Sequence, residues 1–95
     1  MHSVLFVATI PAQRHDWSEF VERAIQKLET AKGAIRIAEN VWLLDLQQSV
    51  APLGWLVSLA EQKGVLHGLL AFEHAPEWLP ASFDPMPIQG RNVEN

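Results

Sequence analysis

Apolar residues in the segment 41–46, Val-Trp-Leu-Leu-Asp-Leu, fall on both sides of a predicted strand. Successive side chains of a strand point to opposite sides of the sheet, so a half-buried strand alternates apolar and polar residues. In this segment both sets are apolar, with Val41 and Leu43 on one side and Trp42, Leu44 and Leu46 on the other. The segment 4–8 repeats the pattern. Both faces of the sheet are therefore expected to be covered, and an exposed apolar face usually marks an interface.

The spacing of apolar residues predicts four strands and two helices. Segments rich in Val, Ile, Leu and Phe predict strands at 3–10, 34–38, 41–46 and 65–72. A helical repeat of three and four residues follows the first strand, at Trp17, Val21, Ala24, Leu28 and Ala31. A second helix is expected from residue 50, with an apolar stripe at Leu53, Leu56, Val57 and Ala60.

Polar residues and glycines mark the expected ends of these elements. Asp16 is the expected N-cap of the first helix and Ser49 that of the second. Gly33 and Gly64 are expected to end the two helices in the left-handed conformation. Residues 39–40 form a two-residue hairpin turn, in which Asn40 tolerates a positive φ.

This order of elements predicts an α+β, ferredoxin-like βαββαβ sandwich. Its four-stranded antiparallel sheet carries both helices on one face, and its first and third strands lie at the centre. These are the two strands that are apolar on both sides. We expect the domain to span residues 1–75. A proline-rich extension, 76–95, is expected to pack on the domain or on a partner chain through about Ile88, with 90–95 mobile.

Composition and charge narrow the class of protein. The 95 residues are 48% hydrophobic and 19% charged, which is typical of one globular domain. No apolar run is long enough for a membrane span, and no basic segment precedes the first strand, so neither a membrane anchor nor a signal peptide is expected. The chain has no cysteine and is compatible with a reducing cytoplasm. With a net charge of −4 and scattered basic residues, nucleic acid is an unlikely partner, though it is not excluded.

In the order of its elements, and in the aromatic-aliphatic run Val41-Trp42-Leu43-Leu44, the chain resembles the small ferredoxin-like proteins related to Cas2. The resemblance implies pairing through sheets and tails, and it raises the alternative of a nucleic-acid-binding protein. Nuclease members carry a metal-binding aspartate at the end of the first strand, where Thr9 stands here. Threonine lacks the charge that Mg²⁺ favours, so the nuclease activity is not carried over.

The remaining polar residues do not form a catalytic motif. His67 and Glu73 share a face of the last strand but lie about 20 Å apart, which is too far for one metal ion, and His74 could join them only if the chain folded back. We therefore expect no metal site and no cofactor. The neighbours His15 and Asp16 seldom face each other, and no serine lies in a nucleophile motif. Asp45 is either a buried carboxylate with a raised pKa or a residue at the end of its strand that reaches solvent or pairs with Arg36 across the hairpin. No catalytic residue is predicted, although an enzyme is not excluded.

The sequence thus favours a non-catalytic module that forms homodimers, and a larger protein assembly built from them stays open. The expected interface residues are Trp42, Leu44, Leu46, Trp78 and Phe83. For Trp42 and Trp78 an ordinary core position is the open alternative. Two other functions also stay open: a Cas2-like nucleic-acid-binding protein without the nuclease aspartate, and a small-molecule-sensing regulatory domain. Whether a partner chain or the C-terminal segment covers the second face of the sheet is not decided by the sequence.

Overall fold

The computed structural model describes residues 2–83. Its elements follow the order β1 (Ser3–Ala8), α1 (Arg14–Leu28), β2 (Ala34–Ala38), β3 (Val41–Asp45), α2 (Val50–Lys63) and β4 (His67–Phe72). The six elements are those that the hydrophobic pattern predicts, and their bounds agree to within a few residues.

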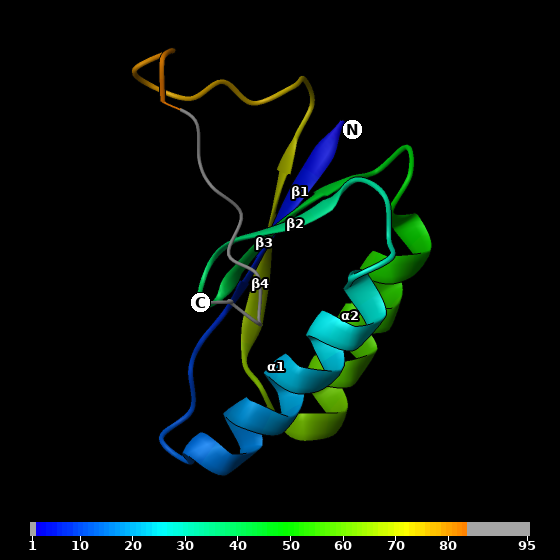
Figure 1. Cartoon of the computed structure of the whole chain (residues 1–95), viewed down its shortest axis with the longest axis vertical. Coiled ribbons are helices and arrows are strands. Elements are labelled where there is room, and N and C mark those ends of the chain that lie inside the picture. Colours follow the sequence, from blue (N-terminus) through cyan, green and yellow to red (C-terminus); the bar gives the residue numbers. More distant parts are fainter. Residues whose placement is uncertain (1, 84–95) are drawn as a thin grey trace.

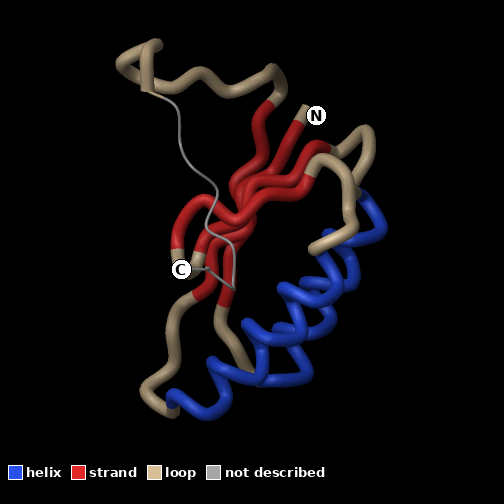
Figure 2. Tube along the Cα trace, viewed as in Figure 1, coloured by secondary structure: helices blue, strands red, loops and turns tan. Residues whose placement is uncertain are grey.

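The sheet confirms the predicted ferredoxin-like arrangement. Its strands lie in the order β2-β3-β1-β4, and every neighbouring pair is antiparallel. Both helices pack on the same side of this sheet (Figures 1 and 2). The strands β1 and β3 occupy the centre, while β2 and β4 form the two edges.

Aromatic rings fill the space between the sheet and the helices. Phe6 of β1 lies at the centre, with its ring 6.4 Å from that of Phe20 on α1 and 5.8 Å from that of Trp42 on β3. The Trp17 ring lies 5.5 Å from that of Phe20. Offset and edge-to-face contacts at such distances stabilise a core beyond the burial of area alone. The α2 side of the core is aliphatic, with Leu56, Leu59 and Ala60.

The first helix begins and ends earlier than expected. It begins at Arg14 after Gln13, so Asp16 lies in its first turn and is not the N-cap; no side chain caps this end. A carboxylate in the first turn still interacts favourably with the helix dipole. The helix ends at Leu28, and Gly33, with φ +80°, lies in the turn that leads into β2.

The second helix agrees better with the prediction. It follows Ser49, and Gly64 ends it with φ +68°. The Ser49 hydroxyl does not cap the helix but donates to the carbonyl of Lys32 at 2.5 Å. This bond ties the start of α2 to the loop after α1.

The β2–β3 turn differs from the expected geometry. Asn40 does not have a positive φ. Its side-chain amide donates to the carbonyl of Ala8 at 2.7 Å, and the N–H of Ala8 donates to the carbonyl of Asn40 at 2.9 Å. The residue therefore joins the hairpin turn to the end of β1.

Residues 73–83, which we call the arm, extend beyond the end of the sheet (Figure 1). In the arm, the rings of Trp78 and Phe83 lie 5.3 Å apart, and the N–H of Phe83 donates to the carbonyl of Pro80. The expectations of packing through about Ile88, and of mobility at 90–95, fall outside the described residues.

Candidate functional site

The strand register decides which apolar residues face the helices. Trp42 and Leu44 point into the aromatic core and are only 2% and 0% exposed. They are core residues of their own chain, which for Trp42 is the alternative that the sequence left open. Leu46 is half-buried just beyond β3, where its N–H donates to the carbonyl of His2. A candidate interface therefore has to be sought on the opposite side of the sheet.

That opposite side, which we call the open face, carries an aliphatic row across all four strands. Ile35 pairs with Leu43, Leu43 with Leu5, and Leu5 with Leu70. A second row runs beside it, through Val41, Val7 and Gly68. Directly paired residues lie on one side of a sheet, with their Cβ atoms about 5 Å apart. The two rows thus form one continuous apolar surface.

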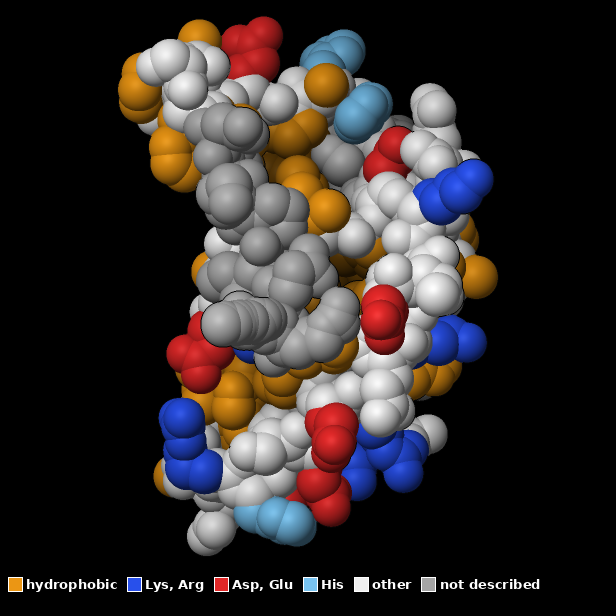
Figure 3. Space-filling model, viewed as in Figure 1, with side chains coloured by type: hydrophobic (Ala, Val, Ile, Leu, Met, Phe, Trp, Pro, Cys, Tyr) orange, Lys and Arg blue, Asp and Glu red, His pale blue; other side chains and the backbone are white. Residues whose placement is uncertain are grey.

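Among the described residues, no helix covers this surface. Leu70 is 56% exposed and Val7 is 39% exposed, although Val7 lies on a central strand. In the space-filling view, hydrophobic side chains gather over the strands, while most charged side chains lie over the helices and at the ends of the sheet (Figure 3). A side of a sheet that is apolar and accessible is the kind of surface that binds another apolar surface.

The arm borders one end of the open face. Pro76, Glu77 and Trp78 line a cavity of about 160 Å³ together with residues of the sheet, namely Leu5, Leu43 and Phe72. Trp78 therefore lies where the sequence expected a contact with the second face, and it is still partly exposed. Phe83 is exposed farther along the arm.

Asp45 at the end of β3 is not the buried carboxylate with a raised pKa that the sequence allowed. Its carboxylate accepts the N–H of Gln47 at 2.9 Å and the side-chain amide of Gln48 at 3.1 Å. These two hydrogen bonds lower the pKa of Asp45 below its ordinary value of 3.8. The carboxylate holds the turn after β3, and it does not pair with Arg36.

Arg36 is held by its own hairpin instead. Its guanidinium donates twice to the carbonyl of Glu39, at 3.2 and 2.7 Å, and lies 5.4 Å from the centre of the Trp42 ring. Burial lowers the pKa of Arg36, and nearby Glu39 opposes this effect.

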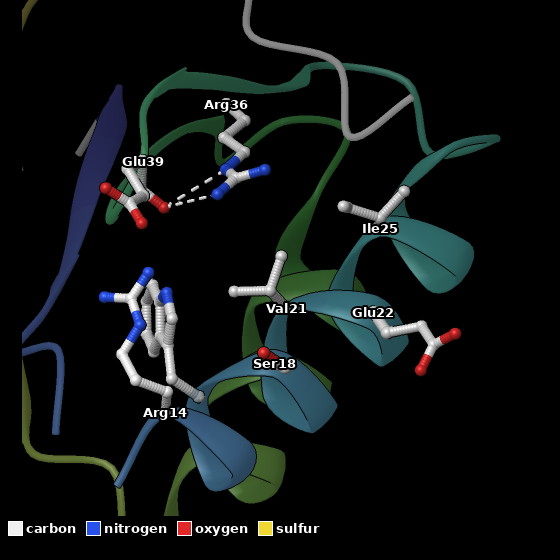
Figure 4. A pocket seen from close by; sticks show the side chains of 8 residues that line it. Arg14, Ser18, Val21, Glu22, Ile25, Arg36 and Glu39 are labelled. Atoms are coloured by element: carbon white, nitrogen blue, oxygen red, sulfur yellow. Dashed lines mark hydrogen bonds between the residues drawn. The ribbon is translucent and has the colours of Figure 1, made fainter. Parts of the chain in front are cut away.

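Arg36 and Glu39 line one wall of an open cleft of about 500 Å³, and α1 forms the other wall (Figure 4). Arg14, Ser18 and Glu22 belong to the α1 wall. The two arginines and two glutamates balance in charge, so the cleft does not concentrate charge of one sign. It lies beside α1, away from the open face.

The histidines have structural surroundings. The His67 ring stacks on Phe6 at 5.1 Å, and its Nδ1 lies 3.0 Å from the carbonyl oxygen of Val65. His74 is exposed in the arm. Residues 2–83 contain no group of three side chains that could hold a metal ion.

His15 pairs with Glu19 one turn farther along α1 and not with Asp16. His15 Nε2 lies 3.3 Å from Glu19, whose other oxygen accepts a hydrogen bond from Lys63 of α2 at 2.8 Å. The bond from Lys63 lowers the pKa of Glu19. This cluster joins the two helices at the surface.

Leu5, Val7, Ile35, Leu43 and Leu70 were not among the interface residues expected from the sequence. The signal that would have found them is the size of the alternating side chains. Phe6 and Trp42 have long side chains that reach a helix layer, so their aliphatic neighbours in the chain must occupy the other face.

Comparisons with models of protein families, with curated proteins and with solved structures found no match for this chain. In the part of the chain that the structure describes, neither helix has the length and apolar character that a membrane crossing requires.

Proposed function

We propose that this protein is a non-catalytic module that associates with a second copy of itself through the open face. One observation carries the proposal: an aliphatic row, Ile35–Leu43–Leu5–Leu70, crosses the whole sheet on a side that no described helix covers. Burial of such a surface is favourable by roughly 25 cal/mol for each Å² removed from water.

The chemistry of the row favours a second copy as the occupant. In a two-fold dimer the same patch of both chains comes together, so like residues meet like. The two rows of the open face contain only Leu, Ile, Val and Gly, so no charge within these rows would be placed against its own copy, and the charge of Asp45 lies at the edge of the face. Trp78 at the end of the face adds an aromatic anchor of the kind that is enriched in interfaces.

The open face can be tested with a pair of Val→Glu variants. Val7 lies in the open face, whereas Val50, 62% exposed, lies at the start of α2 in the helix layer. We expect Val7→Glu to halve the mass measured by light scattering at micromolar concentration, because a carboxylate in the interface would have to be desolvated. Val50→Glu should keep the wild-type mass. Equal masses for the wild type and Val7→Glu would refute the proposal.

The same column, run with a short DNA or RNA duplex at low salt, addresses the nucleic-acid alternative. We expect the protein to ignore the duplex, since a chain with a net charge of −4 gains little from phosphate contacts. Co-elution would favour a Cas2-like binding protein instead. A ligand that raises the melting temperature would favour the small-molecule sensor. We place the module in the cytoplasm, with which a cysteine-free chain is compatible.

A further inference from the structure

The edge strand β4 is apolar from Gly68 to Phe72. β4 is the last strand of the sheet, so among the described residues only β1 pairs with it. Its sequence, His-Gly-Leu-Leu-Ala-Phe, contains no proline and no acidic or strongly basic residue, and the four residues from Gly68 to Ala71 are all exposed. A strand of this composition at the edge of a sheet is open to pairing with another strand.

The opposite edge of the same sheet is protected. The pairing of β2 with β3 is interrupted by a shift of register, as at a β-bulge, between Arg36 and Ala38. A bulge bends and twists a strand, and a charged residue on an edge opposes the approach of another apolar strand. β2 carries both features and β4 carries neither, so the two edges differ in what they can bind.

Main-chain hydrogen bonding identifies the kind of partner that fits this edge. In an antiparallel ladder, every second residue of an edge strand directs its N–H and C=O groups outward. Another extended strand satisfies these groups, whereas a helix or a small apolar ligand does not. We propose that β4 pairs with β4 of a second copy, antiparallel about a two-fold axis, to form a continuous eight-stranded sheet.

The composition of β4 favours a second copy over a foreign peptide. A two-fold axis through the strand places identical residues opposite each other, which is destabilising for charged residues and favourable for leucines. When the axis passes through Leu69 or Leu70, each side chain stays on its own side of the enlarged sheet, and the aliphatic row of the open face continues into the second copy. β4 carries no acidic or strongly basic residue that would select a particular peptide sequence, and the cavity of about 160 Å³ beside the arm touches it only at Phe72, its last residue.

This inference goes beyond the proposed function because the edge and the open face are different surfaces. A chain that uses both forms an assembly of four copies, two paired through β4 and two such pairs stacked through their open faces. Each surface can be blocked without changing the other. Leu69 is 51% exposed and pairs with Phe6, so it lies on the helix side of β4 and outside the open face.

The experiment combines an edge variant, Leu69→Lys, with the open-face variant, Val7→Glu. We expect four copies for the wild type, two for Leu69→Lys, two for Val7→Glu and one for the double variant, by light scattering. Val50→Lys, an exposed change in the helix layer, is the control and should keep the wild-type mass. Ala71→Lys repeats the edge test at a second exposed residue of β4 should Leu69→Lys fail to fold.

The outcomes separate the two proposals. If Val7→Glu halves the mass and Leu69→Lys does not, the edge inference is wrong and the proposed function stands. If only Leu69→Lys halves the mass, the edge inference stands and the open-face dimer is wrong. A monomeric wild type overturns both.

Hydrogen exchange gives a second, direct measurement of the edge. Exchange of the outward main-chain amides of β4 should slow as the protein concentration rises, and Leu69→Lys should abolish this dependence. Slow exchange that is independent of concentration in a monomer would mean that the chain's own C-terminal segment covers the edge, and the inference would be wrong.

Discussion

The two faces of the sheet are both apolar, but they are built from side chains of different shape. On the helix side, Phe6 and Trp42 meet edge to face at 5.8 Å and contact a third ring from α1. On the open face the directly paired residues, Leu5 and Leu43, are aliphatic. Long rings reach across the gap to a helix layer, whereas short branched side chains form a smooth surface. Apolar character alone therefore does not distinguish the packed face of this sheet from its open face, whereas side-chain size does.

The largest effect is expected from substitutions at adjacent residues on opposite faces. Trp42→Ala should destabilise the fold by about 3–5 kcal/mol, because it removes a buried ring at the centre of the core. Leu43→Ala should cost about 1 kcal/mol in the isolated chain, because its side chain is only half-buried there. Denaturant unfolding gives both values.

Light scattering completes this comparison. Leu43→Ala should weaken self-association, whereas Trp42→Ala should weaken folding first. Equal losses of folding stability in the two variants would show that the open face is already covered within one chain.

A smaller effect is expected at the turn before β2, where the register of the two faces is set. A Cβ atom at Gly33 would lie 3.0 Å from Cβ of Asp45 and 3.1 Å from the Ser49 hydroxyl, and the residue has a positive φ. Gly33→Ala should therefore destabilise the fold by roughly 1–2 kcal/mol. The matched variant Gly54→Ala, in the middle of α2 with open space beside it, should stabilise by about 0.5–1 kcal/mol. Thermal unfolding that changes in the same direction in both variants would contradict this account of the turn.

The smallest effect concerns the charge at the edge of the open face. The two hydrogen bonds to the Asp45 carboxylate lower its pKa in the folded state. Its contribution to stability is therefore present above the ordinary value of 3.8 and is lost as the pH falls through the lower folded value. This contribution to folding stability is small because the Asp45 carboxylate is exposed to solvent.

As the pH falls below the ordinary value of 3.8, thermal unfolding of Asp45→Asn should show less loss of stability than that of the wild type. Glu73→Gln, which removes an exposed carboxylate that accepts no hydrogen bond from the described residues, is the control. Identical pH profiles for the wild type and Asp45→Asn would show that the two bonds do not hold the turn.

The architecture was predictable because the spacing of apolar residues is typical of a strand in each strand and of a helix in each helix. The central position of β1 and β3 followed from the ferredoxin-like order of elements, and the two apolar sides of each strand agree with it. Residues that make long-range hydrogen bonds were predicted less well. Asn40 binds Ala8, 32 residues earlier, and this contact takes the place of the positive φ that local turn chemistry favours. Asp16 failed as a cap because the helix begins before it.

The candidate site was predicted as a kind of surface and only in part as residues. The alternation of side chains along a strand does not show which of the two sets faces the helices. Trp42 and Leu44 were therefore predicted at the interface, whereas they lie in the core. Trp78 was expected at the second face and does border it. The role of Asp45 depended on Gln47 and Gln48, two neighbours whose orientation is not encoded in any periodicity.

Because β1 and β4 are antiparallel neighbours, the beginning and the end of the folded unit lie at one corner of the sheet. Ser3 lies opposite Phe72, and the N–H of His2 donates to the carbonyl of Phe72 at 2.7 Å. A short linker would join these two points into a closed ring, and new ends could be opened in the exposed loop around Thr30. Such a circular permutant would retain every strand pairing, since the architecture does not depend on which strand the ribosome makes first.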